Sequence, residues 1–288
     1  MNTLPIRQFL HFIRSRYVFN NLPYSSNFEI KDKIDYKFTF LIGTSGSGTT
    51  VLSRILCSPR PVIGIDDFKD VPVSDGSARK FVHRFKITTE ILWDKTSSTH
   101  DYRRAKSALP QIVNDLIRHK FYKDASHIVH KRSSPFFWGD RFRPDMSDLF
   151  DVFKDPKIIV IYRDPSESTY SSLRRGFGLH VKHLAVICEN QLTYINSQVS
   201  QLRKDTYKII TYEDLCTRPI ETIEELAKFS GLPFDELEKA TTREQLTQSK
   251  MGRWRQSLPI DDVIFLDAFF NDRRKSQWNV LCNSGKQG

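Results

Sequence analysis

Five short apolar runs along the chain are predicted to be buried β-strands. Two of them, Phe38–Ile42 and Ile158–Tyr162, are nearly continuous in Ile, Val, Leu and aromatic residues. Strands covered on both faces have this composition, whereas strands with one solvated face alternate apolar and polar positions. The five expected strands are Lys37–Gly43, Pro61–Ile65, Ser126–Lys131, Lys157–Tyr162 and Tyr207–Tyr212.

Segments between these runs are predicted to be helices, and several carry explicit end signals. Asp164 is a candidate N-cap, with Pro165 at the first helical position and Glu167 three residues after the cap. Gly231 is expected to end a later helix. The expected helices are Thr49–Leu56, Lys80–Leu92, Ser107–Phe121, Met146–Phe153, Pro165–Arg174, Val181–Leu202 and Ile220–Ser230. This alternation predicts an α/β fold with a doubly wound, mainly parallel five-stranded sheet, whose ligands lie at the carboxyl ends of the strands.

No Pro/Gly/Ser-rich linker divides the chain, so one domain is expected over residues 37–270, followed by a tail at 271–288. Residues 1–36 precede it as an amphipathic helix and lead-in, in which apolar positions alternate with basic ones. We expect that helix to pack on the body or on a partner chain, with a membrane surface as the alternative. No apolar run approaches 18 residues, so no membrane span is expected.

The charge balance favours an anionic partner. The 288 residues include 44 Lys and Arg against 34 Asp and Glu, a net charge of +10. This positive charge would suit nucleic acid, an acidic membrane, or a phosphorylated or sulfated small molecule. The basic residues are scattered among acids, which argues against nucleic acid. The four cysteines are widely separated and none forms a metal-binding spacing, so no metal and a cytoplasmic location are expected.

A Gly-rich turn, Gly43–Thr50, lies between the first strand and the first helix. Such a turn gathers backbone N–H groups and a positive helix end around one anion. Its spacing matches a Walker A loop, except that Thr49 stands where the lysine is required. The missing lysine argues against a kinase or NTPase, which stays as the alternative.

A second anion site is expected where the fourth strand ends. Arg163 follows that strand, and Ser171 lies about two turns into the next helix. The two side chains can converge on a second phosphate. In the alternative interpretation, Arg163 pairs with Asp164 and Ser171 is solvated.

Together the two motifs resemble the PAPS-dependent sulfotransferase family, where PAPS is 3′-phosphoadenosine 5′-phosphosulfate. FLIGTSGSGTTVLSRIL resembles its 5′-phosphosulfate loop, and KIIVIYRDPSESTYSS resembles its 3′-phosphate motif. The blocks Tyr212–Leu215 and Gly252–Arg255 match in order downstream. The resemblance implies a sulfotransferase domain of P-loop nucleotide-kinase-like fold that uses PAPS as co-substrate. It is similar to bacterial tailoring enzymes, with features of the tyrosylprotein sulfotransferase branch.

The resemblance also implies which residues bind PAPS. The 3′-phosphate would be held by Arg163 and Ser171, helped by Arg253 and Lys250. Tyr212 would lie near the adenine, unless it is a buried aromatic at the strand end. The 5′ end would be held by Ser45, Gly46, Ser47, Gly48, Thr49 and Thr50.

Many family members carry Arg or Lys at the position of Gly46, so either another cation stabilises the leaving group here or backbone amides contribute more of this stabilisation. Lys131, at the end of the third strand, is the candidate, and Arg141 is the rival. By the same resemblance, Asp67 is the general base, with His83 and His130 as alternatives.

The acceptor is expected to be a small molecule. The acidic cluster Asp66, Asp67 and Asp70 would suit a cationic one, such as a saxitoxin-type guanidinium alkaloid. A catalytically degenerate nucleotide-binding protein is a further alternative, because Gly46 replaces a cation. A homodimer is left open, and no other protein partner is expected.

Overall fold

The computed structural model describes residues 34–60, 62–66, 82, 84–86, 88–89, 99–119, 122–133, 146–244, 246 and 251–273. Its sheet has the strand order β2-β3-β1-β4-β5, and every neighbouring pair is parallel. The strands are β1 (Lys37–Gly43), β2 (Val62–Asp66), β3 (His127–Ser133), β4 (Lys157–Tyr162) and β5 (Tyr207–Thr211). The predicted fold class, a doubly wound parallel sheet, is confirmed.

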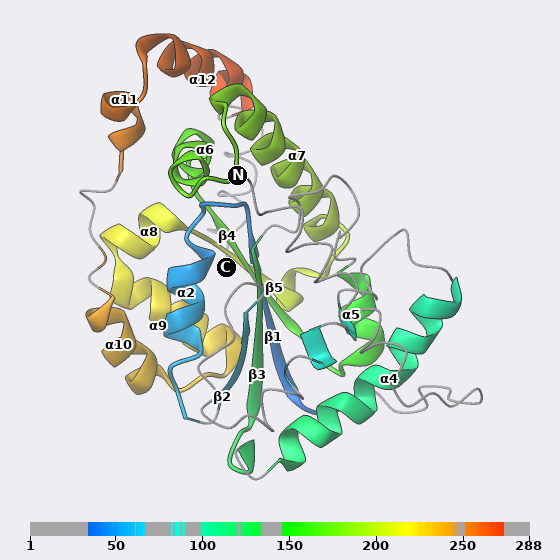
Figure 1. Cartoon of the computed structure of the whole chain (residues 1–288). Coiled ribbons are helices and arrows are strands. Elements are labelled where there is room, and N and C mark those ends of the chain that lie inside the picture. The colour runs from blue at the N-terminus through cyan, green and yellow to red at the C-terminus, as the bar shows by residue number, and fades with distance from the viewer. Residues whose placement is uncertain are drawn as a thin grey trace.

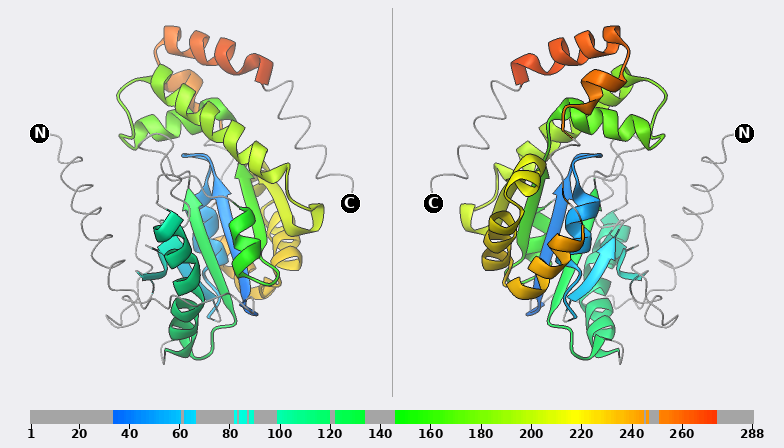
Figure 2. Two further views of the ribbon diagram at one scale, coloured as in Figure 1. Left: turned by 90° about the vertical axis from the view of Figure 1, so that its right-hand side faces the viewer. Right: turned by 90° about the vertical axis from the view of Figure 1, so that its left-hand side faces the viewer.

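Helices cover both faces of the sheet (Figure 1). On one face lie α2 (Thr49–Leu56), α8 (Tyr212–Thr217), α9 (Pro219–Ser230) and α10 (Phe234–Arg243). On the other lie α4 (Thr99–Arg118), α5 (Ser147–Val152) and α7 (Val181–Val199). Beyond the carboxyl ends of the strands lie α6 (Pro165–Arg174), α11 (Arg253–Ser257) and α12 (Ile260–Arg273), an arrangement that Figure 2 shows from both sides. A 3-10 turn, Lys204–Thr206, leads into β5.

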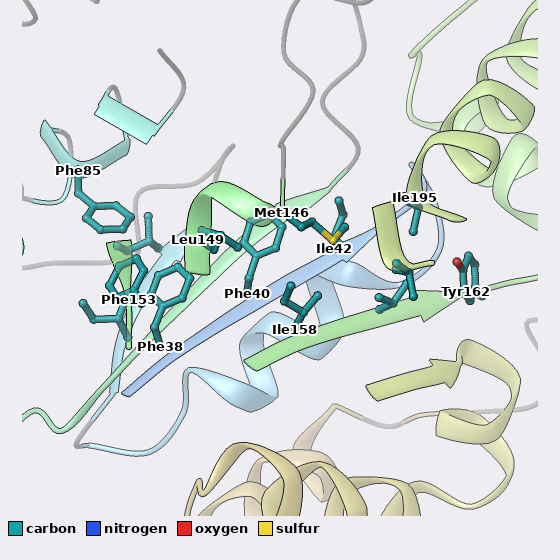
Figure 3. Packing of buried hydrophobic residues seen from close by; sticks show 14 of the residues in the cluster. Phe38, Phe40, Ile42, Phe85, Met146, Leu149, Phe153, Ile158, Tyr162 and Ile195 are labelled. Atoms are coloured by element: carbon teal, nitrogen blue, oxygen red, sulfur yellow. The ribbon is translucent and has the colours of Figure 1, made fainter. Parts of the chain in front are cut away.

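Each face of the sheet buries its own apolar cluster, which explains the nearly continuous apolar runs of β1 and β4. Phe38 and Phe40 of β1 point to the α4–α5–α7 side, where Phe38 stacks on Phe153 with ring centroids 4.0 Å apart (Figure 3). Leu41 points to the α2 side and packs with Leu52 and Ile55 of α2. Because successive residues of a strand face opposite sides, a strand covered on both sides must be apolar throughout.

Sequence signals within single segments correctly predicted the bounds of several helices and strands. β1, β4, α2 and α6 have the predicted bounds. The predicted N-cap of α6 is confirmed, because the Asp164 carboxylate accepts hydrogen bonds from the N–H groups of Ser166 and Glu167, at 2.9 and 3.1 Å. Gly231 ends α9 in the left-handed region, at φ 72°.

Other predicted bounds were wrong. α4 begins at Thr99, not at Ser107, because its first two turns are mostly polar and show little apolar periodicity. β2 runs one residue later than predicted, and β3 continues to Ser133, paired along its length with β1. The described residues of the predicted helix Lys80–Leu92 are helical, whereas the predicted N-terminal helix lies outside the described residues. No helix in the described part is long and apolar enough to cross a membrane.

Candidate active site

The Gly-rich loop joins β1 to α2 at the carboxyl edge of the sheet. Gly48, the N-cap of α2, has φ 101° and, as a glycine, provides no side chain to cap the first turn of the helix. The first N–H groups of a helix have no partner within the helix, so they can bind an anion. A Cβ on Gly48 would lie 2.4 Å from the Tyr212 ring, so this position requires glycine.

Two buried hydroxyl groups near this loop support an anion site. The Oγ atoms of Ser47, in the loop, and of Ser168, in α6, are buried without a hydrogen-bond partner among the described residues. Leaving a buried polar group without a partner costs about 1–3 kcal/mol. Thr49 and Thr50 follow in the first turn of α2, the former buried and the latter half-buried. Hydroxyl groups and helix amides together fit a phosphate or phosphosulfate group.

The first half of the loop is docked on α6 and α7. The Ser172 hydroxyl donates to Ser45 Oγ at 3.0 Å, and Gln191 Oε1 accepts from the Ser45 N–H at 3.2 Å. Sequence reasoning missed both partners: Ser172 is adjacent to the expected Ser171, whereas Gln191 stands in a helix without any motif. The loop conformation therefore depends on side chains more than 120 residues away.

Gly46, where the family resemblance expects a cation, has no room for one. Its φ is 84°, and a Cβ built there would lie 2.4 Å from the Ser168 carbonyl oxygen and 3.0 Å from Ser171 Cβ. The glycine thus lets the loop contact α6 directly. The same contact brings Ser171, which is half-buried, next to the loop.

We expect that Gly46→Lys, which restores the cation, destabilises the protein. Left-handed backbone costs a non-glycine residue about 1–2 kcal/mol, and overpacking against α6 adds about 1–3 kcal/mol. Gly176→Lys is the matched control, since Gly176 has φ 72° but nothing within 4 Å of its Cβ position. Urea denaturation should show the larger loss of unfolding free energy for Gly46→Lys. Equal losses would contradict the steric argument.

Arg163 lies directly after β4, is buried, and connects the two predicted anion sites. Its Nη1 donates to the Gly46 carbonyl at 3.1 Å, and its Nη2 pairs with Glu167 Oε2 at 3.2 Å. The guanidinium carbon lies 4.3 Å from the centre of the Tyr212 ring, and the same ring lies close to Gly48 of the loop. The sequence predicted two separate anion sites, and the structure places their residues in contact.

Two carboxylates lie near Arg163, of which Glu167 is buried and Glu213 is half-buried. Burial raises the pKa of Glu167, while the Arg163 charge and the Gly252 N–H act in the opposite direction. Burial also raises the pKa of Glu213, whose Oε1 accepts from the Asp164 N–H at 3.0 Å. Burial raises the pKa of Tyr212 to about 12, so its hydroxyl stays protonated. The cation of Arg163 is thus balanced within the protein itself.

Lys131 lies in β3 and is 1% exposed. It stands in register with Leu41 of β1 and Asp66 of β2. Val129, two residues earlier, belongs to the cluster on the α2 side, so Lys131 points to the face from which the loop enters α2. Lys131 was predicted to end this strand, but β3 continues for two more residues, to Ser133.

Several predicted site residues fall outside the described residues: Asp67, Lys250, Arg141 and His83. The other alternative base, His130, is fully buried and packs against the rings of Phe38, Phe40 and Phe85, with centroids 5.5 to 6.4 Å apart. The structure thus makes His130 a core residue. Arg253 is exposed at the first position of α11.

Comparisons with known proteins identify the family to which the chain belongs. The model of the sulfotransferase family matches residues 39–236, more than half of the chain. Carbohydrate sulfotransferase 1 of Rattus norvegicus and of Homo sapiens are each 28% identical over 115 residues, which cover 32% of this chain and 28% of each relative. The chain therefore matches these curated relatives over less than a third of their length.

Solved structures share the fold. A sulfotransferase domain from the curacin biosynthetic pathway has 15% identity and a TM-score of 0.52, covering 83% of this chain and 99% of that one. The domain from the Synechococcus PCC 7002 olefin synthase has 17% identity and a TM-score of 0.53, covering 83% and 96%. A mouse sulfotransferase complexed with PAP has 12% identity and a TM-score of 0.50, covering 88% and 90%.

Proposed function

The chain belongs to the sulfotransferase family, and from that premise we propose that it transfers a sulfuryl group from PAPS to a hydroxyl or nitrogen of a small-molecule acceptor. The supporting observation is the contact between the Gly-rich loop and Arg163, which brings two sets of anion-binding groups together. PAPS carries a 3′-phosphate and a 5′-phosphosulfate on one adenosine. Two adjacent anion sites suit such a molecule better than a single polyphosphate chain.

The residues divide between the two ends of PAPS. The amides and hydroxyls of Ser45–Thr50 bind the 5′-phosphosulfate, and the uncapped first turn of α2 supports this role. Arg163 and Ser171 bind the 3′-phosphate, together with Arg253 and Lys250 from the C-terminal segment. Tyr212 lies under the Arg163 guanidinium and orients it from the adenine side of the site.

The chemistry requires a base and a cation, and both come from the carboxyl edge of the sheet. Asp67, directly after β2, removes the acceptor proton, and Lys131 stabilises the negative charge that develops on the leaving phosphate oxygen. The register of Lys131 with Asp66, the residue before Asp67 in the sequence, supports this pairing. Arg141 is the alternative cation.

The acceptor is proposed from chemistry alone. The acidic cluster after β2 suits a cationic small molecule, such as a guanidinium alkaloid of secondary metabolism. A saccharide hydroxyl is a second candidate, favoured by the local identity to carbohydrate sulfotransferase 1. The wide spacing of the four cysteines supports a cytoplasmic enzyme. Incubation with radiolabelled PAPS and acceptors of each class would separate the two candidates.

Thermal denaturation with nucleotides tests the co-substrate. Adenosine 3′,5′-bisphosphate (PAP) is expected to stabilise the protein by about 2.7 kcal/mol at a hundred times its Kd. AMP and ADP, which lack the 3′-phosphate, should stabilise it far less. Stronger stabilisation by ATP with Mg²⁺ would favour the alternative, a P-loop kinase. Equal stabilisation by PAP and AMP would contradict the proposed 3′-phosphate site.

A further inference from the structure

Glu167 uses its two carboxylate oxygens on two different segments of the chain. Its Oε2 pairs with Arg163 Nη2 at 3.2 Å, and the two side chains are 5% and 10% exposed. Its Oε1 accepts a hydrogen bond from the Gly252 N–H, 85 residues further along the chain. One buried side chain thus contacts both the end of β4 and the start of α11.

The second segment is the one that carries Arg253. Gly252 is in the left-handed region, at φ 77°, and is the N-cap of α11. The next two residues differ in burial: Arg253 is exposed, whereas Trp254 is buried. Arg255 pairs with Asp267 of α12, so α11 and α12 are joined to each other and Glu167 joins them to α6 (Figure 1).

We propose that Glu167 is a positioning residue that holds Arg163 and the Arg253 segment together for one phosphate group. This inference rests on the proposed function, in which both arginines bind the 3′-phosphate of PAPS. When two segments that are distant in the sequence bind one ligand, ordering them at the moment of binding costs free energy and weakens the affinity. The Glu167 bridge orders them in the free protein, before the nucleotide arrives.

The two contacts respond differently to substitution. Glu167→Gln keeps a carbonyl oxygen for the Gly252 N–H but loses the charge that pairs with Arg163. Glu167→Ala loses both contacts. Glu213→Gln is the matched control, because Glu213 is half-buried and close enough to Arg163 to feel its charge, but accepts from the Asp164 N–H and not from the C-terminal segment.

The test measures PAP binding by calorimetry to the wild type, to these variants, to Arg253→Ala and to Glu167→Ala/Arg253→Ala. Glu167→Ala and Arg253→Ala should each weaken binding about tenfold, the typical loss for a charge-assisted contact. The double variant should bind PAP hardly more weakly than either single variant, because both side chains act through the same contact with the phosphate. Glu167→Gln should fall between the wild type and Glu167→Ala, and Glu213→Gln should combine additively with Arg253→Ala.

Additive losses for Glu167→Ala and Arg253→Ala, or wild-type binding by Glu167→Ala, would overturn the positioning role. Hydrogen exchange gives a readout that needs no nucleotide: the amides of residues 252–257 should exchange faster in Glu167→Ala, with near-wild-type protection in Glu167→Gln. Unchanged exchange in Glu167→Ala would also overturn it. If the wild type fails to bind PAP but residues 252–257 exchange faster in Glu167→Ala, the proposed function is wrong, whereas the ordering of this segment by Glu167 is supported.

Discussion

Replacing Lys131 by methionine is expected to lower kcat by about 10²–10³-fold, the usual loss when one preorganised electrostatic group is removed. Lys131 is 1% exposed, lies two residues before the end of β3, and points to the face of the sheet that α2 covers. In such a buried position, a cation acts on developing charge with little screening by water. The KM for PAPS should change little, because the phosphate groups are bound by other residues. Steady-state kinetics with saturating acceptor would separate the two parameters.

The neighbouring residue offers a matched control. Arg132 is also buried in β3, but it points to the opposite face of the sheet, the side of His130. Arg132→Met removes a buried cation from the same strand and should leave kcat within a few-fold of the wild type. Equal losses in the two variants would point to general damage to β3, and unchanged kcat in Lys131→Met would remove Lys131 from the mechanism.

The parts of this site that the sequence predicts are those encoded within one segment. The end signals of α6 need only Asp164 and the residues just after it, and the structure confirms them. The position of the loop between β1 and α2 was likewise predicted from its own glycines, although its conformation also depends on contacts with α6 and α7. In both cases the signal lies within a few consecutive residues, because the first N–H groups of a helix must find partners beyond the helix's own backbone carbonyls.

The parts that could not be predicted depend on contacts between distant segments. Nothing local to Gln191 indicates that it accepts a hydrogen bond from Ser45, and nothing local to Gly46 shows that α6 blocks a side chain there. The start of α4 was missed for a different reason, because its polar first turns lack the apolar period on which the prediction depends. Tertiary packing supplies this information, and a single sequence does not express it.

Replacing Arg163 by alanine is expected to raise the KM for PAPS roughly 10- to 150-fold, equivalent to about 1.5–3 kcal/mol for a charge-assisted hydrogen bond. The substitution also removes the donor to the Gly46 carbonyl and leaves Glu167 without its cation. Breaking a buried ion pair from one side costs about 3–5 kcal/mol of stability. The melting temperature should therefore fall together with the affinity.

A double variant separates the two effects. In Arg163→Ala/Glu167→Ala no unpaired carboxylate remains at this point, so part of the lost stability should return, while the KM for PAPS should stay high because no guanidinium binds the 3′-phosphate. Arg163→Lys keeps a charge but loses the planar group that lies over Tyr212, and should fall between the wild type and Arg163→Ala. If the double variant recovers a normal KM, Arg163 serves only to neutralise Glu167, and the 3′-phosphate must be held elsewhere.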